Sequence, residues 1–207
     1  MEVPLPLSFA ATKIQPPRQR RTRLARPALE AALRAALQRS RVVVLQAPAG
    51  YGKTSLLASL AAPQPGRALA WVSIDEDDDD DQRFFACLSA ALEPFDLPWR
   101  IAPEALAALL GSGDTSRALA ELLNALAGAD VQQGVIVLDD LHRIDAGPVH
   151  ALIEGLVERL PPQWVLVMSS RVLPPLPLSR WRAAGDLALF DQERLAFSAD
   201  EVAALAA

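Results

Sequence analysis

Cysteine, long apolar runs and a signal sequence are scarce or missing in this chain. The single cysteine, Cys87, excludes an internal disulfide and fits a reducing cytosol. No apolar run approaches the roughly 20 residues that a membrane-spanning helix requires. The first residues, Met1 to Pro4, lack the basic-then-apolar order of a signal peptide. We therefore predict a cytoplasmic protein in which Cys87 is a small buried residue on a helix.

Acidic residues are in excess overall, but basic residues gather near the N-terminus. Residues 1–41 contain nine Lys or Arg and two acidic residues, whereas the rest of the chain contains 11 Lys or Arg and 23 acidic residues. A basic arm on an acidic body is one sign of nucleic-acid binding. Because the arm has one aromatic residue, Phe9, and no stacking pattern, we do not favour that function for it. Residues 1–27, rich in proline and arginine, are expected to form an extended lead-in.

Short aliphatic runs alternate with stretches of helical periodicity along the rest of the chain. Continuous apolar runs are typical of strands buried on both faces, and their alternation with helices predicts a three-layer α/β fold with a parallel sheet. We expect strands at 41–45, 68–74, 134–138, 164–168 and 187–190. We expect helices at 27–40, 103–110, 115–128 and 147–160, from the first loop to about 60, from about 81 through 92, and after Ser198.

A glycine-bearing segment between the first strand and the next helix carries the strongest chemical signal. Residues 47–54, Ala-Pro-Ala-Gly-Tyr-Gly-Lys-Thr, match the phosphate-loop (P-loop) pattern, with alanine where glycine is commoner. The glycines permit a loop whose N–H groups face a polyphosphate, and the helix directs its positive end there. Lys53 is expected to bind the β- and γ-phosphates and Thr54 to bind Mg²⁺. The predicted nucleotide-binding residues are Ala47, Pro48, Ala49, Gly50, Tyr51, Gly52, Lys53, Thr54 and Ser55.

Two carboxylates follow the apolar run 135–138, about 85 residues after the P-loop. Phosphates bind at the carboxyl edge of open α/β sheets, where this strand is expected to end. We predict that Asp139 holds Mg²⁺ through water, since Mg²⁺ keeps part of its hydration shell. Strand alternation directs Asp140 to the other side. Asp140 is the candidate for orienting or deprotonating the attacking water.

Other polar residues at strand ends are weaker candidates. Arg171 ends the run Ser-Ser-Arg after the fourth strand and is a candidate to stabilise charge on the γ-phosphate. His142 lies near Asp140 in sequence and could contact the site, although a lone loop histidine usually has no catalytic role. His150 is expected to be structural. The acidic run 75–81 is expected to be a solvated loop, with Asp80 or Asp81 capping the next helix.

Several motifs, in their order, resemble the N-terminal part of the MalT-type, LuxR-family ATP-dependent transcriptional activators. The matching segments are 12–18, 47–54, 71–76, Arg83–Phe84, 138–142, Ser170–Arg171 and 195–198. The resemblance covers nearly the whole chain. One departure is the unbroken aspartate run, where the family usually has a mixed acidic stretch containing Asn and Pro.

The resemblance implies a STAND-class P-loop ATPase in which ATP with Mg²⁺ acts as a conformational switch. ATP and an inducer would drive self-association, and slow hydrolysis would reset the protein. The sensor strand, ending at Arg171, would lie between the P-loop strand and the Asp-Asp strand, and Arg23 to Arg26 would lie near the adenine. We assign 1–27 to the lead-in and 28–207 to the nucleotide-binding domain. The family's lid, inducer-binding region and DNA-binding domain would then be absent from these 207 residues.

Two other functions remain open from the sequence. One is a stand-alone P-loop enzyme, either a kinase with a lid bearing Arg180 or Arg182 or a nucleic-acid-dependent ATPase. The other is a module that binds nucleotide without turnover. The sequence does not distinguish ATP from GTP, and it does not name the inducer, the regulated genes or the oligomeric state.

Overall fold

A parallel five-stranded sheet forms the centre of the computed structural model, which describes residues 9–18, 24–62, 64–145, 147–198 and 201–202. The strands lie in the order β2-β3-β4-β1-β5. The strand β4 therefore separates β1 from β3, as the family resemblance implied. Their bounds are β1 Val42–Gln46, β2 Arg67–Ser73, β3 Gln133–Asp139, β4 Trp164–Ser170 and β5 Leu187–Phe190.

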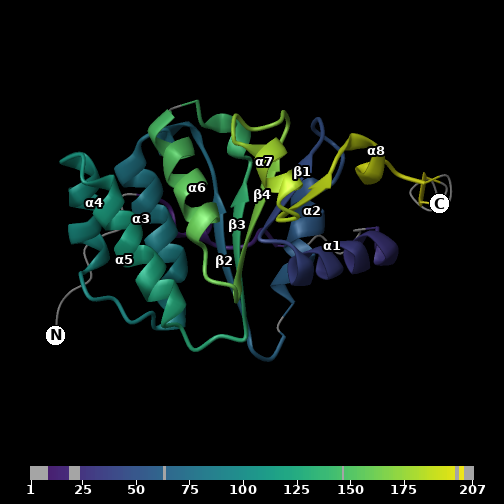
Figure 1. Ribbon diagram of the computed structural model, residues 1–207. Coiled ribbons are helices and arrows are strands. Elements are labelled where there is room, and N and C mark those ends of the chain that lie inside the picture. Colours follow the sequence, from purple (N-terminus) through teal and green to yellow (C-terminus); the bar gives the residue numbers. More distant parts are fainter. Residues whose placement is uncertain (1–8, 19–23, 63, 146, 199–200, 203–207) are drawn as a thin grey trace.

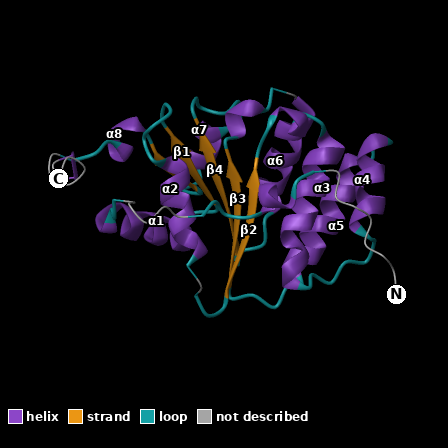
Figure 2. Ribbon diagram, turned by 180° about the vertical axis from the view of Figure 1, so that it is seen from behind, coloured by secondary structure: helices purple, strands orange, loops and turns teal. Residues whose placement is uncertain are grey.

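Helices cover both faces of the sheet, so the predicted three-layer α/β fold is confirmed (Figures 1 and 2). Helices α3 to α6 pack on one face, and α1, α2 and α8 pack on the other. The helices are α1 Pro27–Arg39, α2 Lys53–Ala58, α3 Asp81–Leu92, α4 Pro103–Gly111, α5 Thr115–Ala127, α6 Gly147–Arg159, α7 Leu178–Ala183 and α8 Gln192–Leu195.

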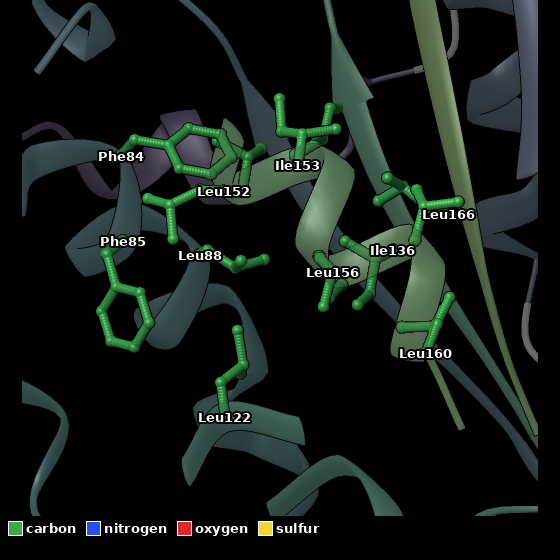
Figure 3. Close-up of a cluster of buried hydrophobic side chains, with 14 of the residues drawn as sticks. Phe84, Phe85, Leu88, Leu122, Ile136, Leu152, Ile153, Leu156, Leu160 and Leu166 are labelled. Atoms are coloured by element: carbon green, nitrogen blue, oxygen red, sulfur yellow. The ribbon is translucent and has the colours of Figure 1, made fainter. Parts of the chain in front are cut away.

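The two apolar layers explain why the strands lack an alternating pattern. All seven residues of β4 are buried, because both faces of this central strand are covered. On one face, aromatic and aliphatic side chains of α3, α5 and α6 meet those of β3 and β4 (Figure 3). The labelled members of this cluster are Phe84, Phe85, Leu88, Leu122, Ile136, Leu152, Ile153, Leu156, Leu160 and Leu166.

Short helices are the main difference from the predicted elements. The helices α7 and α8 lie in stretches for which we predicted no helix, because six and four residues are too few to show helical periodicity. Within the expected extended lead-in, Ala11–Ile14 form one turn of 3-10 helix (η1) that packs on β2 and α3. The helix expected after Ser198 falls largely outside the described residues.

The aspartate-rich run after β2 is a packed turn, which corrects the expectation of a solvated loop. Asp78 is fully buried, and Lys13 Nζ lies 2.5 Å from its carboxylate and 2.5 Å from that of Asp75. Paired burial of this kind compensates the cost of removing charges from water. The expected helix cap is confirmed, since Asp80 Oδ1 accepts a hydrogen bond from the N–H of Arg83.

The same turn also contacts the loop that follows β3. Asp79 Oδ1 accepts a hydrogen bond of 2.9 Å from the N–H of Asp145, and Glu76 lies 3.7 Å from Arg143. These contacts join the carboxyl ends of β2 and β3. In the described part of the chain, no helix is both long and apolar enough to span a bilayer.

Candidate functional site

The loop between β1 and α2 has an open cradle suited to a polyphosphate. Gly50 and Gly52 have φ values of 89° and 75°, which other residues rarely adopt. A Cβ atom built on either glycine meets no atom within 4 Å, so the space beside the loop is free. The helix α2 begins at Lys53 and therefore directs its N–H groups towards this loop.

Lys53 is the first residue of α2, and its side chain contacts the preceding loop. Its Nζ donates hydrogen bonds to the carbonyls of Ala47 at 2.6 Å and Pro48 at 3.0 Å, and the residue is 6% exposed. Burial lowers the pKa of Lys53, whereas the nearby carboxylates of Asp140 and Asp139 raise it. The charges of both candidate acidic residues therefore act on this ammonium group.

Thr54 and Asp139 meet across the carboxyl edge of the sheet. Thr54 Oγ1 donates a hydrogen bond of 3.2 Å to Asp139 Oδ1, although the two residues are 85 positions apart. A hydroxyl and a carboxylate side by side fit Mg²⁺, which typically takes one or two protein oxygens together with phosphate and water. No group of three His, Cys, Asp or Glu side chains suited to a metal occurs within the described residues.

Ser169 is a site residue that the sequence analysis missed. Its Oγ donates to Asp139 Oδ1 at 2.5 Å and accepts from the N–H of Asp140 at 3.0 Å. Burial raises the pKa of Asp139, and the hydrogen bond from Ser169 opposes that rise. The sequence carried no signal for this contact, because it depends on the register of β3 and β4, in which Leu138 pairs with Met168.

Asp140 lies on a left-handed turn immediately after β3. Its φ is 65°, so its side-chain direction follows from this turn and not from the strand alternation that we assumed. The turn continues into the 3-10 helix η5, Leu141–Arg143. His142 Nδ1 lies 3.8 Å from Asp140 Oδ1, which places the histidine beside the candidate base. His150 is buried on α6, in agreement with a structural role.

Arg171 lies at the same edge, directly after β4. Its carbonyl accepts a hydrogen bond from Gln46 Nε2, which joins it to the end of β1. Arg171 is exposed and contributes to lowering the pKa of both Lys53 and His142. The structure therefore gathers Lys53, Asp139, Asp140 and Arg171 at one edge, as the motif spacing predicted, while their individual roles stay predictions.

The basic segment before α1 is only partly described. Arg23 lies outside the described residues, while Arg26 donates to the carbonyls of Leu195 and Ala196 and to the Glu201 carboxylate. Its guanidinium also lies 4.6 Å from the ring centroid of Phe197. Arg26 thus connects the beginning of α1 to the segment after α8.

A separate cavity of about 400 Å³ lies at the amino edge of the sheet, opposite the P-loop. Its Arg41 donates to the carbonyls of Glu158 and Leu160 at the end of α6 and lies 3.8 Å from Asp186. Because the guanidinium of Arg41 is already engaged by these carbonyls and by Asp186, we assign the nucleotide to the carboxyl edge and not to this cavity.

Comparisons with known proteins show the family to which the chain belongs. The family described as AAA ATPase domain matches residues 20–168. The HTH-type transcriptional regulators MalT of Yersinia enterocolitica and Serratia proteamaculans are 32% and 33% identical over 161 and 162 residues, or 78% of this chain. The match spans only 18% of the length of each regulator. It confirms the resemblance to MalT-type regulators.

A solved structure supports the fold alone. The Walker-type ATPase of Pyrococcus abyssi superposes with a TM-score of 0.57 at 14% identity, covering 92% of this chain and 59% of the other. At this identity the comparison concerns the arrangement of helices and strands. It agrees with the P-loop ATPase architecture described above.

Proposed function

Because the chain belongs to the AAA ATPase domain family, we propose that it is the ATP-binding, slowly hydrolysing switch domain of a signal-responsive bacterial transcriptional regulator. The observation that carries this proposal is the contact between Thr54 and Asp139 beside Lys53. A hydroxyl, a carboxylate and an ammonium group near one another support the binding of a triphosphate with Mg²⁺. We propose that the protein lies in the cytoplasm, where ATP is available.

In this proposal each residue of the site has a separate role. The loop amides and Lys53 bind the phosphates, and Thr54 and Asp139 hold Mg²⁺, which when bound neutralises charge on the phosphate oxygens. Asp140 orients or deprotonates the attacking water, and Arg171 stabilises the charge that develops on the γ-phosphate. Ser169 holds Asp139 and the backbone of Asp140 in register.

The regulatory part of the proposal rests on the MalT likeness. The relatives are named HTH-type transcriptional regulators, and this chain corresponds to a small part of their length. We propose that DNA contact and inducer binding belong to regions beyond these residues, and that ATP promotes self-association of the longer protein. Switch function predicts turnover well below the roughly 1–10³ s⁻¹ that is common among enzymes.

A stand-alone kinase is less well supported, because one candidate lid residue is engaged elsewhere. Arg180 forms ion pairs with Glu154 and Glu158 on the surface of α6. Phosphoryl transfer to a small acceptor, or fast turnover stimulated by DNA, would favour this enzyme class over a switch. Tight binding without any hydrolysis would favour a module that only holds nucleotide.

Calorimetric titration tests the proposal directly. We expect ATP and ADP to bind with higher affinity in the presence of Mg²⁺, and GTP to bind more weakly. The Lys53→Ala variant should lose measurable affinity while remaining folded, because Lys53 contacts loop carbonyls and not the apolar core. Wild-type protein that binds no nucleotide with or without Mg²⁺ would refute the proposal.

A further inference from the structure

A side-chain hydrogen bond joins the P-loop to helix α8. Gln192 Nε2 donates to the Tyr51 hydroxyl at 3.0 Å, although the two residues are 141 positions apart. Tyr51 lies between Gly50 and Gly52, which both have positive φ values. Glycine restricts the backbone less than any other residue, so this part of the loop is easily deformed. The contact therefore restrains the loop at its most deformable point.

Helix α8 is itself held in place by contacts that do not involve the P-loop. Leu195 is fully buried in the apolar layer that also contains side chains of α1 and α2. At the start of α8, Asp191 Oδ1 accepts a hydrogen bond of 3.0 Å from the N–H of Arg194. At its end, Arg26 Nη1 donates to the carbonyl of Leu195 at 2.8 Å. Gln192 is therefore attached to a helix whose position is set by the core and by the residue before α1.

The side chain of Tyr51 is held by its ring as well as by its hydroxyl. The ring is half-buried and packs against the same apolar layer as α8. Lys53 separately fixes the beginning of the loop, since its Nζ donates to the carbonyls of Ala47 and Pro48. A Cβ atom built on either glycine of the loop meets no atom within 4 Å, so the cradle between these contacts is open. Together the contacts hold the loop in an open shape.

We propose that Gln192 is a positioning residue for phosphate binding, whose hydrogen bond to Tyr51 holds the P-loop in the shape that receives a polyphosphate. This inference rests on the proposed nucleotide-binding function. A loop that moves freely loses conformational entropy when a ligand orders it. A loop that is already held in the bound shape loses less, and its affinity for the ligand is higher. Because the contact acts through the loop, its effect does not depend on the nucleobase.

Two substitutions remove the contact from either side. Tyr51→Phe removes the hydroxyl and keeps the ring, and Gln192→Ala removes the donor at an exposed position. We expect each to raise the Kd of Mg²⁺-ATP about 2- to 10-fold, the range expected for one neutral hydrogen bond. The double variant should bind no more weakly than either single variant, because the contact is already lost. Gln38→Ala, the same truncation at an exposed position of α1, is the control.

A series of ligands separates an effect on the loop from an effect on the base. Calorimetry with ATP and ADP, and displacement of ATP by inorganic tripolyphosphate, give the affinity of each variant for the three ligands. We expect Gln192→Ala to weaken all three by the same factor and to raise KM for ATP with little change in kcat. A loss for ATP and ADP with none for tripolyphosphate would overturn the proposal, because the two side chains would then act on the nucleoside.

Nitrogen relaxation NMR tests the restraint on the loop without nucleotide. We expect the backbone order parameters of Gly50 and Gly52 to fall in Tyr51→Phe and in Gln192→Ala, and to stay unchanged in Gln38→Ala. Order parameters report motion on the picosecond to nanosecond timescale, where a freed loop tip moves. Order parameters equal to wild type in both contact variants would overturn the proposal. Melting temperatures of the variants serve as the control for folding.

The outcomes distinguish the positioning role from the function on which it rests. Wild-type affinity for ATP in Gln192→Ala, or additive losses in the double variant, would refute the positioning role while leaving nucleotide binding intact. Wild-type protein that binds neither ATP nor tripolyphosphate would refute the proposed function. In that case the order parameters still decide whether the contact between Gln192 and Tyr51 restrains the loop.

Discussion

At the scale of single residues, Asp139 is a site residue whose ionised side chain destabilises the folded state. Burial raises the pKa of its carboxyl, and hydrogen bonds from Ser169 and Thr54 only partly offset this. The folded state therefore holds the proton more tightly than the unfolded state. Above the unfolded pKa near 3.8 the ionised group destabilises the nucleotide-free domain, and the penalty disappears as pH falls below that value.

Replacing this carboxylate should stabilise the empty domain and impair metal binding. We expect Asp139→Asn to raise the melting temperature at pH 7 by a few degrees, since about 1 kcal/mol corresponds to about 2–4 °C for a chain of this size. The gain should shrink as pH is lowered towards 4, and Mg²⁺ should no longer enhance ATP binding. Asp130→Asn, at an exposed position, is the control. A fall in melting temperature at pH 7 would contradict this account.

Cys87 makes a second prediction at this scale. Burial, with the Asp78 carboxylate 3.5 Å from Sγ, raises the pKa of the Cys87 thiol to about 12. Because the thiolate is the reactive form, a thiol reagent at pH 8 should label folded protein very slowly and unfolded protein at once. Cys87 is the single cysteine, so the absorbance change of a chromogenic thiol reagent reports on this residue alone. Equal labelling rates in both states would show that the thiol is accessible.

At the scale of elements, a buried ion pair fastens η1 to the turn after β2. Lys13 is 7% exposed and its partner Asp78 is fully buried, so neither charge is well solvated. Removing one partner of such a pair typically costs about 3–5 kcal/mol when the other charge is left unpaired. Here Arg83 Nε, 3.7 Å from Asp78 Oδ1, remains as a more distant partner, so the low end of this range applies.

We therefore expect Lys13→Met to lower the free energy of unfolding by about 3 kcal/mol. Urea denaturation followed by circular dichroism measures this, with Arg18→Met as a control at an exposed position. Adding Asp78→Asn to Lys13→Met should recover part of the loss, since it removes the stranded charge. Additive losses in the double variant would mean that the two residues do not act as a pair.

The turns at the carboxyl ends of the strands also form a connected set of elements. The turn after β2 contacts the turn after β3 through Asp79 and Glu76, and the turn after β3 contacts β4 through Ser169. The P-loop contacts α8 in turn, because Gln192 Nε2 donates to the Tyr51 hydroxyl. Each of these turns lies at the edge where the nucleotide is proposed to bind.

At the scale of the whole molecule, ligand binding should appear as thermal stability. A ligand that binds only the folded state stabilises it by about 2.7 kcal/mol at 100 times its Kd. For a chain of this size that corresponds to a rise of about 5–10 °C in melting temperature. We expect this rise for wild type with Mg²⁺ and ATP and none for Lys53→Ala. An equal rise in both proteins would show that binding does not use the P-loop.

The strand order explains why residues far apart in sequence share one edge. Parallel strands all end on the same side, and β4 lies between β1 and β3. The Lys53 helix, the Asp139 strand end and the Arg171 loop are therefore neighbours. The order itself was inferred from a family resemblance, because the alternation of strands and helices is compatible with several orders.

The strands, the longer helices, the P-loop and the pair Asp139–Asp140 could all be predicted from the amino-acid pattern. These features depend on neighbouring residues, through apolar periodicity and the conformational freedom of glycine. The tertiary structure alone decided the contact of Thr54 with Asp139, the role of Ser169, the burial of Lys13 with Asp78 and the approach of His142 to Asp140. Contacts between distant segments depend on strand order and turn geometry, and neither can be predicted from a local pattern of residues.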